Sequence, residues 1–196
     1  MTTENKTYFV ILFALLISIL MNIKVVNKYD KYEVSTDDIQ NHSMIKGDLP
    51  DIWKNGQIIK NDLNEGKNYF LAGEEDHRSY LPPRLIALFS YIFNFELFEN
   101  WNEKIISSDN KKIYYLFFQT TLYFLVLIIF FREIKKKFDL KICFFIICFL
   151  SFEPSLFLFH SSFHTESIFF SLQILMLCFL FNDTFSKTKF FFIGLL

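Results

Sequence analysis

IYYLFFQTTLYFLVLIIFF, residues 113 to 131, is the stretch that decides the fold class of this chain. It contains 19 uncharged residues in a row, between Lys111-Lys112 and Arg132. A helix needs about 20 mainly apolar residues to cross the hydrocarbon core of a bilayer. The stretch is too long and too evenly apolar for a strand of a transmembrane barrel. It therefore predicts a membrane-spanning helix.

Further apolar runs lie on both sides of this stretch. Besides the span at about 113 to 131, the sequence predicts spans at about 7 to 26, 142 to 159 and 166 to 182. Another run begins at about 190 and is still apolar at residue 196. Because a span does not end in the middle of the hydrocarbon, we expect the chain to be the N-terminal part of a longer protein.

The run near the N-terminus also allows a different interpretation, a cleaved signal peptide. Such a peptide has a basic start and a cleavage site flanked by small residues. The start MTTENK is barely basic, and the segment NIKVVNKYD that follows the run offers no such site. The run therefore favours an uncleaved signal-anchor.

The composition agrees with a membrane protein. Hydrophobic residues make up 52% of the chain, 28 residues are Phe, and the charged residues lie mainly between the apolar runs. The formal net charge of −1 gives no basic field for nucleic acid. The three cysteines, Cys143, Cys148 and Cys178, lie inside apolar runs and are expected to be apolar interior residues. We therefore predict an all-α, polytopic helical membrane protein that forms one membrane domain, residues 1 to 196.

Residues 27 to 112 form a large polar loop that contains two apolar patches. The patch at 52 to 63 has loose helical spacing. The patch at 81 to 98 begins LPPR, and the two prolines suit the first turn of a helix, where a missing N–H costs little. The second patch is too short to span, so it predicts an interfacial or re-entrant helix. The loop is expected to contain amphipathic helices.

Orientation follows from the cations in the short loops. The N-terminus and the loops at 132–141 and 183–189 share one side, and the turn at 153–166 on the other side has none. The eight cations are Lys6, Arg132, Lys135, Lys136, Lys137, Lys141, Lys187 and Lys189. Lysines just after the first run favour the opposite orientation. The dense 132–141 cluster decides for a cytoplasmic N-terminus, in what we expect to be a bacterial inner membrane, and the large loop is then non-cytoplasmic.

Two groups of ionisable residues lie on the expected non-cytoplasmic side. The loop holds Asp48, Arg78 and Arg84, and the 153–166 turn contains Glu153, His160, His164 and Glu166. Ionisable residues at the ends of membrane spans are costly unless they are hydrated or paired, so they are candidates for a functional site. Ordinary explanations stay open: interfacial anchoring for the arginines, and helix capping or hydration for the glutamates. The two histidines are four residues apart, but no third ligand is evident, so no metal site is assigned.

The arrangement resembles the N-terminal part of a C-type, polyprenyl-phosphate-sugar-dependent membrane glycosyltransferase. The segments that carry the resemblance are GDLPDIWKNG, GKNYFLAGEEDHRSYLPPR and EPSLFLFHSSFHTESIFFSLQILML. They are similar to loop and hairpin segments of the protein O-mannosyltransferase and aminoarabinose transferase group. The family has an acidic residue early in its first loop, which Asp48 matches, although Asp48 lies further from the first span than is usual and Asp30 is an alternative.

The resemblance implies a sugar transfer from a polyprenyl-phosphate-linked donor within the membrane. Asp48 would accept the proton of the acceptor hydroxyl, with Glu166 as a second catalytic acid, and such general-base catalysis is worth roughly 10²–10⁴-fold. Arg78, Arg84, His164 and Glu153 would bind substrate, and the two arginines suit the phosphate because of their bidentate geometry. Membrane lipid is the other expected partner, no cofactor is implied with certainty, and dependence on a divalent metal stays open.

Two alternatives compete with the enzyme hypothesis. One is a non-catalytic membrane component of envelope-glycan assembly, which would share the lipid groove without needing Asp48. The other is a truncated membrane protein without activity. Further spans and a polar C-terminal domain in the reading frame beyond Leu196 would favour the enzyme.

Overall fold

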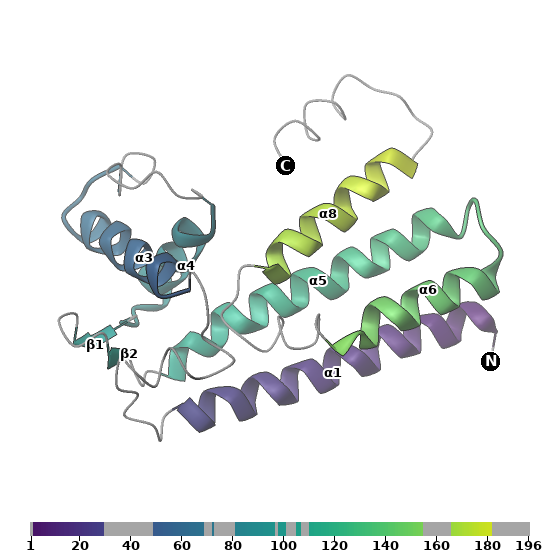
Figure 1. The fold of residues 1–196 in the computed structure, drawn as a ribbon, viewed down its shortest axis with the longest axis horizontal. Coiled ribbons are helices and arrows are strands. Elements are labelled where there is room, and N and C mark those ends of the chain that lie inside the picture. The colour runs from purple at the N-terminus through teal and green to yellow at the C-terminus, as the bar shows by residue number, and fades with distance from the viewer. Residues whose placement is uncertain are drawn as a thin grey trace. The chain divides into compact units, whose positions relative to one another are not determined.

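The computed structural model describes residues 2–29, 49–68, 72, 81–96, 98–100, 105–106, 110–154 and 166–181. Within these ranges the chain is helical apart from one two-stranded ribbon (Figure 1). The helices are α1 (Thr3–Tyr29), α3 (Leu49–Asn64), α4 (Leu81–Phe93), α5 (Ile113–Ile134), α6 (Leu140–Phe152) and α8 (Glu166–Phe181). The short elements are β1 (Phe98–Asn100), β2 (Ile105–Ile106) and the 3₁₀ turn η1 (Asn110–Lys112).

Two of these helices are long and apolar enough to cross a membrane. They are the segment Thr3–Lys24 of α1 and the whole of α5, Ile113–Ile134, each 22 residues long. At 1.5 Å per residue, 22 residues extend over about 33 Å, which matches the roughly 30 Å of hydrocarbon in a bilayer. The prediction that residues 113 to 131 form one long apolar helix is therefore confirmed, and the first apolar run is helical as well.

The later apolar runs are helical over shorter ranges. The helix α6 covers 13 residues and ends at Phe152, whereas the predicted span continues to residue 159. The helix α8 covers 16 residues, close to the predicted range of 166 to 182. Residues 155 to 165 and the expected run at 190 to 196 lie outside the described residues.

Between α5 and α6, Asp139 caps the N-terminus of α6 by accepting a hydrogen bond from the Lys141 amide at 2.7 Å.

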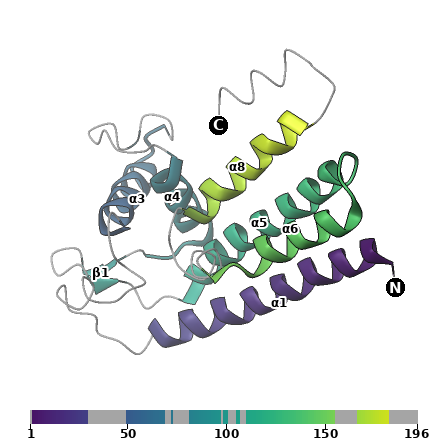
Figure 2. The ribbon, with the colours of Figure 1, turned by 45° about the vertical axis from the view of Figure 1, so that its right-hand side comes forward.

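The chain divides into two compact units. Unit 1 is the helical bundle, made by residues up to 21 of α1, residues from 117 of α5, and all of α6 and α8. Figures 1 and 2 both show α5 and α6 side by side, with α1 running along them. Ring contacts connect the elements: Tyr8 of α1 meets Phe131 of α5 at 5.2 Å, and Phe130 of α5 lies 6.3 Å from Phe181 of α8.

An ion pair joins two helices at one end of the bundle. The Lys135 ammonium, just past the end of α5, lies 2.6 Å from the Glu4 carboxylate in the first turn of α1. The hydrogen bond from this ammonium to Glu4 raises the pKa of Lys135 above its usual value. The pair fixes the N-terminus of α1 beside the C-terminus of α5, so these two helices run in opposite directions.

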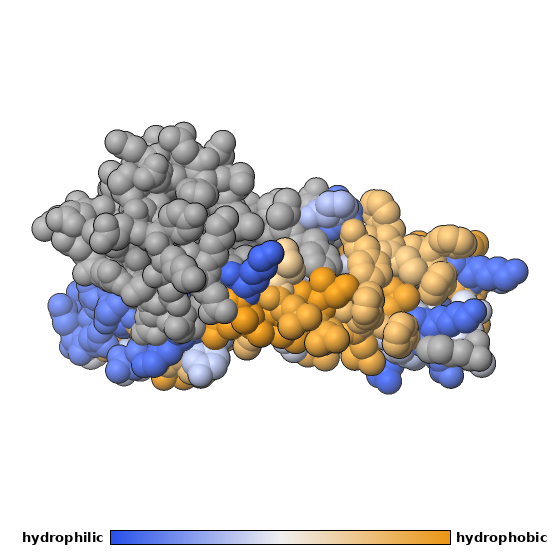
Figure 3. Space-filling view, turned by 90° about the horizontal axis from the view of Figure 1, so that it is seen from below, coloured by the Kyte–Doolittle hydropathy of each residue, from blue (hydrophilic) through white to orange (hydrophobic). Residues whose placement is uncertain are grey.

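The bundle buries a hydrophobic core together with several small polar side chains, and it exposes other large apolar ones. The buried residues of α1 recur every three or four positions, on one face of the helix: Thr7, Ile11, Ala14, Ser18 and Asn22. The outward positions of the bundle include Phe9, Leu12, Leu16, Leu20, Leu125, Phe145, Phe149, Phe169 and Leu180, which are 53–71% exposed. In the face drawn in Figure 3, hydrophobic side chains form a band, and hydrophilic ones lie towards its two ends.

Unit 2 contains the rest of the described chain, including α3, α4, the β1–β2 ribbon and the first turn of α5. A small core of Ile59, Leu63, Ala72 and Ala87 holds α3 against α4. The prediction of two helices in the large loop is confirmed, and α4 begins at Leu81, immediately before the two prolines. The ribbon pairs Phe98 with Ile106 in antiparallel fashion, and the sequence did not predict it.

Candidate functional site

Glu153 is the predicted site residue that unit 1 positions most clearly. It caps the C-terminus of α6 with extended backbone angles (φ −61°, ψ 123°), and its side chain is half-buried. The following Pro154 lacks an N–H and cannot continue the helix, which explains why α6 ends here. The Glu153 carboxylate lies close enough to the Tyr123 hydroxyl to interact with it electrostatically. A carboxylate is therefore held at the end of an apolar helix, beside a buried phenol.

Tyr123 connects α5 to the last turn of α6. Its ring is fully buried, and its hydroxyl donates a hydrogen bond of 2.8 Å to the carbonyl oxygen of Leu150. The last carbonyls of a helix have no partner within that helix, so this bond satisfies one of them. Gln119 and Thr120, one turn earlier on α5, are also completely buried. Gln119, Thr120 and Tyr123 therefore share one face of α5. On this face Tyr123 contacts the last turn of α6, whose C-cap is Glu153.

Two serine hydroxyls near this polar face have no hydrogen-bond partner among the described residues. They are Ser18 on α1 and Ser151 on α6, which are 0% and 2% exposed. Other buried hydroxyls of the bundle bond to the carbonyl four residues earlier, as Ser171 does to Ser167 at 2.7 Å. Ser151 immediately precedes Phe152, whose ring lies 6.4 Å from Phe13 on α1. Because buried polar groups are normally satisfied, these two hydroxyls are candidates for a hydrogen bond to a ligand or a water.

Arg84 is the second predicted site residue that the structure describes. It lies in the first half of α4, is 8% exposed, and donates a hydrogen bond of 3.0 Å to the carbonyl oxygen of Ala72. Its guanidinium therefore holds part of the polar loop against α4. The phosphate-binding role of Arg84 stays a prediction.

The remaining predicted residues cannot be placed. Asp48, Arg78, His160 and His164 lie outside the described residues. Glu166 is the first residue of α8, and its side chain is also outside the described part. Within the described ranges no three His, Cys, Asp or Glu residues group as metal ligands would.

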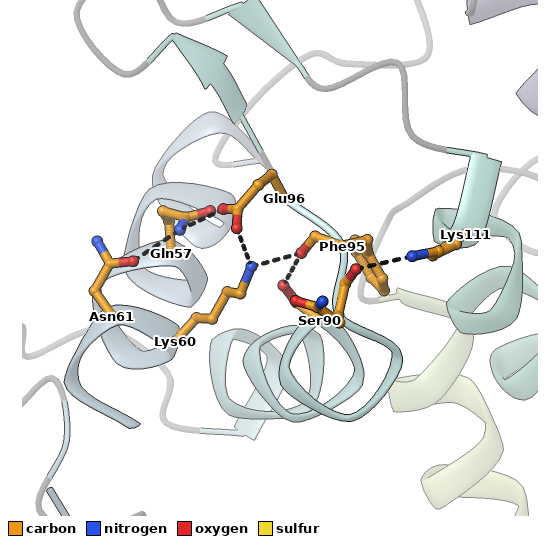
Figure 4. Close-up of polar contacts among 8 residues, drawn as sticks. Gln57, Lys60, Asn61, Ser90, Phe95, Glu96 and Lys111 are labelled. Atoms are coloured by element: carbon orange, nitrogen blue, oxygen red, sulfur yellow. Dashed lines mark hydrogen bonds and ion pairs between the residues drawn. The ribbon is translucent and has the colours of Figure 1, made fainter. Parts of the chain in front are cut away.

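Unit 2 contains a polar cluster that the sequence did not predict (Figure 4). The Lys60 ammonium on α3 donates to the Glu96 carboxylate at 2.6 Å and to the Phe95 carbonyl at 2.8 Å. Ser90 on α4 donates to the same carbonyl at 2.6 Å, and Gln57 donates to the other carboxylate oxygen at 3.2 Å. Lys60 is only 2% exposed, although its partner Glu96 is 58% exposed. The cluster fixes the segment that follows α4 to the face of α3.

The functional residues that the sequence did not predict include some that share a weak signal. Ser18 and Asn22, or Gln119 and Tyr123, are uncharged polar residues spaced four apart within apolar runs. Such spacing places both members of a pair on one helical face, where polar side chains join helices in lipid. Pairing of Lys60 with Glu96, 36 residues later, has no signal of this kind.

Comparison of the chain with protein-family models, with curated proteins and with solved structures finds no match.

The hydrogen bond of Tyr123 can be tested without disturbing the packing. Tyr123→Phe removes only the hydroxyl, so we expect the bundle to lose about 0.5–1.5 kcal/mol, the range typical of side-chain hydrogen bonds between helices in lipid. Unfolding in mixed detergent micelles measures the change. Tyr114→Phe is the matched control, because the Tyr114 side chain is 45% exposed and should have little effect. Equal losses for the two variants would contradict the assignment.

Proposed function

We propose that the chain is a polytopic membrane protein of the inner membrane, with a cytoplasmic N-terminus. The support comes from the outward side chains of the bundle, which are large and apolar: Phe145, Phe149, Phe169 and Leu180 are 58–71% exposed. A surface with so many exposed Phe and Leu side chains is unfavourable in water and suits contact with lipid. In this proposal α1 and α5 cross the bilayer, and the shorter helices α6 and α8, which share the core of α5, are embedded in it beside them.

We further propose that the protein is a glycosyltransferase that uses a polyprenyl-phosphate-linked sugar, or the N-terminal part of one. The observation that carries this proposal is the half-buried carboxylate of Glu153 beside Tyr123 and the unpaired Ser151 hydroxyl. Tyr123 lies at the middle of α5, so in the proposed bilayer these groups are within the hydrocarbon region, where an ionisable residue is costly and indicates a functional site. The resemblance of the loop segments supplies the reaction class.

The proposed reaction needs one carboxylate and one cationic group. The acceptor hydroxyl oxygen attacks the anomeric carbon, the bond between that carbon and the phosphate oxygen breaks, and polyprenyl phosphate leaves. The hydroxyl proton goes to a carboxylate, for which Asp48 is the proposed base and Glu166 a second acid. Glu153 and His164 would bind the sugar or acceptor, and Arg78 and Arg84 would stabilise the departing phosphate.

The test uses the native host and the complete gene. Deletion is expected to abolish transfer of one sugar, measured by mass spectrometry of lipid-linked sugars and envelope glycans. The variants Asp48→Asn and Glu153→Gln are expected to reach the membrane at normal levels without restoring the product. Glu133→Gln is the matched control, because this carboxylate pairs with Lys136 at the opposite end of α5 and should restore it fully.

Each outcome of this test decides something definite. A deletion strain with unchanged glycans would contradict the glycosyltransferase proposal. Full restoration by Asp48→Asn would show that another acid, such as Asp30, is the base. Full restoration by Glu153→Gln would show that the carboxylate of Glu153, at the end of α6, does not take part in the site.

A further inference from the structure

The outer face of α4 is an apolar stripe that is exposed at both of its ends. Its members, spaced three or four apart, are Leu81, Leu85, Leu88 and Ile92. Leu81 and Ile92 at the two ends are 49% and 62% exposed, while Leu85 and Leu88 between them are half-buried. A stripe of this kind needs a cover, because exposed leucine and isoleucine in a row are unfavourable in water.

The opposite face of α4 takes up the polar groups of the helix. Arg84 and Ser90 are 8% and 0% exposed, and both are hydrogen-bonded within unit 2. Ala87 lies between them in the core with Ile59 of α3. The buried face of α4 is therefore mixed, with its polar groups hydrogen-bonded there, and the outer face carries the apolar stripe.

The helix α3 presents a different surface. Its exposed side chains near the C-terminus, together with the turn that follows, are mainly polar: Asn61, Asn64, Glu65, Lys67 and Asn68. There the Lys67 ammonium pairs with Asp62 at 2.6 Å, and this hydrogen bond raises the pKa of Lys67 above its usual value. Unit 2 consequently has one face suited to water, on α3, and one suited to hydrocarbon, on α4.

Contacts within unit 2 place the end of α4 beside the start of a candidate span. The ring of Phe93, the last residue of α4, stacks on Tyr114 in the first turn of α5 at 4.6 Å. Phe89 meets Tyr115 edge-on at 5.7 Å. The Lys111 ammonium, just before α5, donates to the carbonyl of Asn94 at 3.1 Å. Tyrosine and lysine at the end of a span are typical of the bilayer interface, so α4 ends at that level.

The length of α4 excludes a transmembrane arrangement for this helix. Its 13 residues extend over about 20 Å, against roughly 30 Å of hydrocarbon. An amphipathic helix of this kind lies in the interface, with its apolar face in the acyl boundary. We propose that unit 2 rests on the bilayer surface through the stripe Leu81, Leu85, Leu88 and Ile92, which inserts into the lipid, while α3 stays in water.

This inference rests on the proposed membrane character of the chain, and site-directed spin labelling separates the two. Nitroxide labels are attached to single cysteines in a variant with Cys143, Cys148 and Cys178 replaced by alanine, reconstituted in phosphatidylethanolamine and phosphatidylglycerol vesicles. Collision rates with oxygen, which concentrates in lipid, and with a water-soluble nickel chelate then report what surrounds each label. Ile92→Cys and Leu81→Cys probe the stripe. Asn64→Cys on α3 is the matched control, and Phe145→Cys on α6 tests the bundle.

The expected result is a several-fold higher ratio of oxygen to nickel collisions at positions 92 and 81 than at position 64. High nickel collisions at 92 and 81 would show a face in water, and low collisions with both reagents would show a protein partner. Either outcome overturns the inference. The nitroxide at position 145, on the bundle, shows which proposal has failed. Lipid exposure there preserves the membrane proposal, whereas access of the nickel chelate there overturns both proposals.

Discussion

Leu125→Arg is expected to remove most of the protein from the membrane. Leu125 lies near the middle of α5, and its side chain points outward with 53% exposure. An arginine at the centre of a membrane helix costs about 2.5–3.5 kcal/mol on insertion scales, which shifts the insertion equilibrium by about a hundredfold. More than half of the Leu125 side chain is exposed, so the longer arginine can extend outward from the bundle.

The measurement is the fraction of protein that resists alkaline carbonate extraction of membranes. Leu125→Ala is the matched control, since it shortens the same side chain without adding charge, and it should leave that fraction nearly unchanged. In a water-soluble protein, the same Leu125→Arg substitution would have a different effect. There an arginine at an exposed position changes stability by less than about 0.5 kcal/mol and improves solubility. A Leu125→Arg protein that is abundant, folded and soluble would contradict the membrane proposal.

The helical architecture was accessible from the sequence because it depends on local patterns. An uncharged run of 19 residues is sufficient to predict α5, and the two prolines after Leu81 locate the start of α4. Inward-facing residues of α1 could also have been read, since Thr7, Ala14 and Ser18 lie on one face and are smaller than the residues around them.

The candidate site was accessible only in part. Glu153 could be singled out because a carboxylate next to an apolar run is costly, and the structure places it at the end of α6. Its neighbour Tyr123 comes from another helix, 30 residues away, and the pairing depends on how α5 packs against α6. The sequence also implied that Arg84 faces lipid phosphate, whereas its burial and its bond to Ala72 show that it supports the loop as well.

Unit 2 contains an ion pair that the sequence did not predict, between Lys60 and Glu96, and removing it is expected to have a large effect on stability. Glu96→Ala is expected to destabilise unit 2 more than Lys60→Met, although Glu96 is 58% exposed and Lys60 only 2%. Removing the carboxylate leaves a buried ammonium with only the Phe95 carbonyl as a hydrogen-bond acceptor. Breaking a buried pair in this way costs about 3–5 kcal/mol. Screening at the exposed glutamate reduces this to about 2–3 kcal/mol.

Lys60→Met removes the charge and keeps the apolar stem, so its cost is expected to be smaller, about 1 kcal/mol. The Phe95 carbonyl keeps its hydrogen bond from Ser90, and the exposed Glu96 carboxylate returns to water. The double variant Lys60→Met/Glu96→Ala should therefore match Lys60→Met within about 0.5 kcal/mol, because no buried charge is left. Amide hydrogen exchange of α3 and α4 in the detergent-solubilised protein measures these differences. Glu96→Ala should accelerate exchange by about 30- to 150-fold, and a smaller acceleration than that of Lys60→Met would show that Lys60 reaches water by itself.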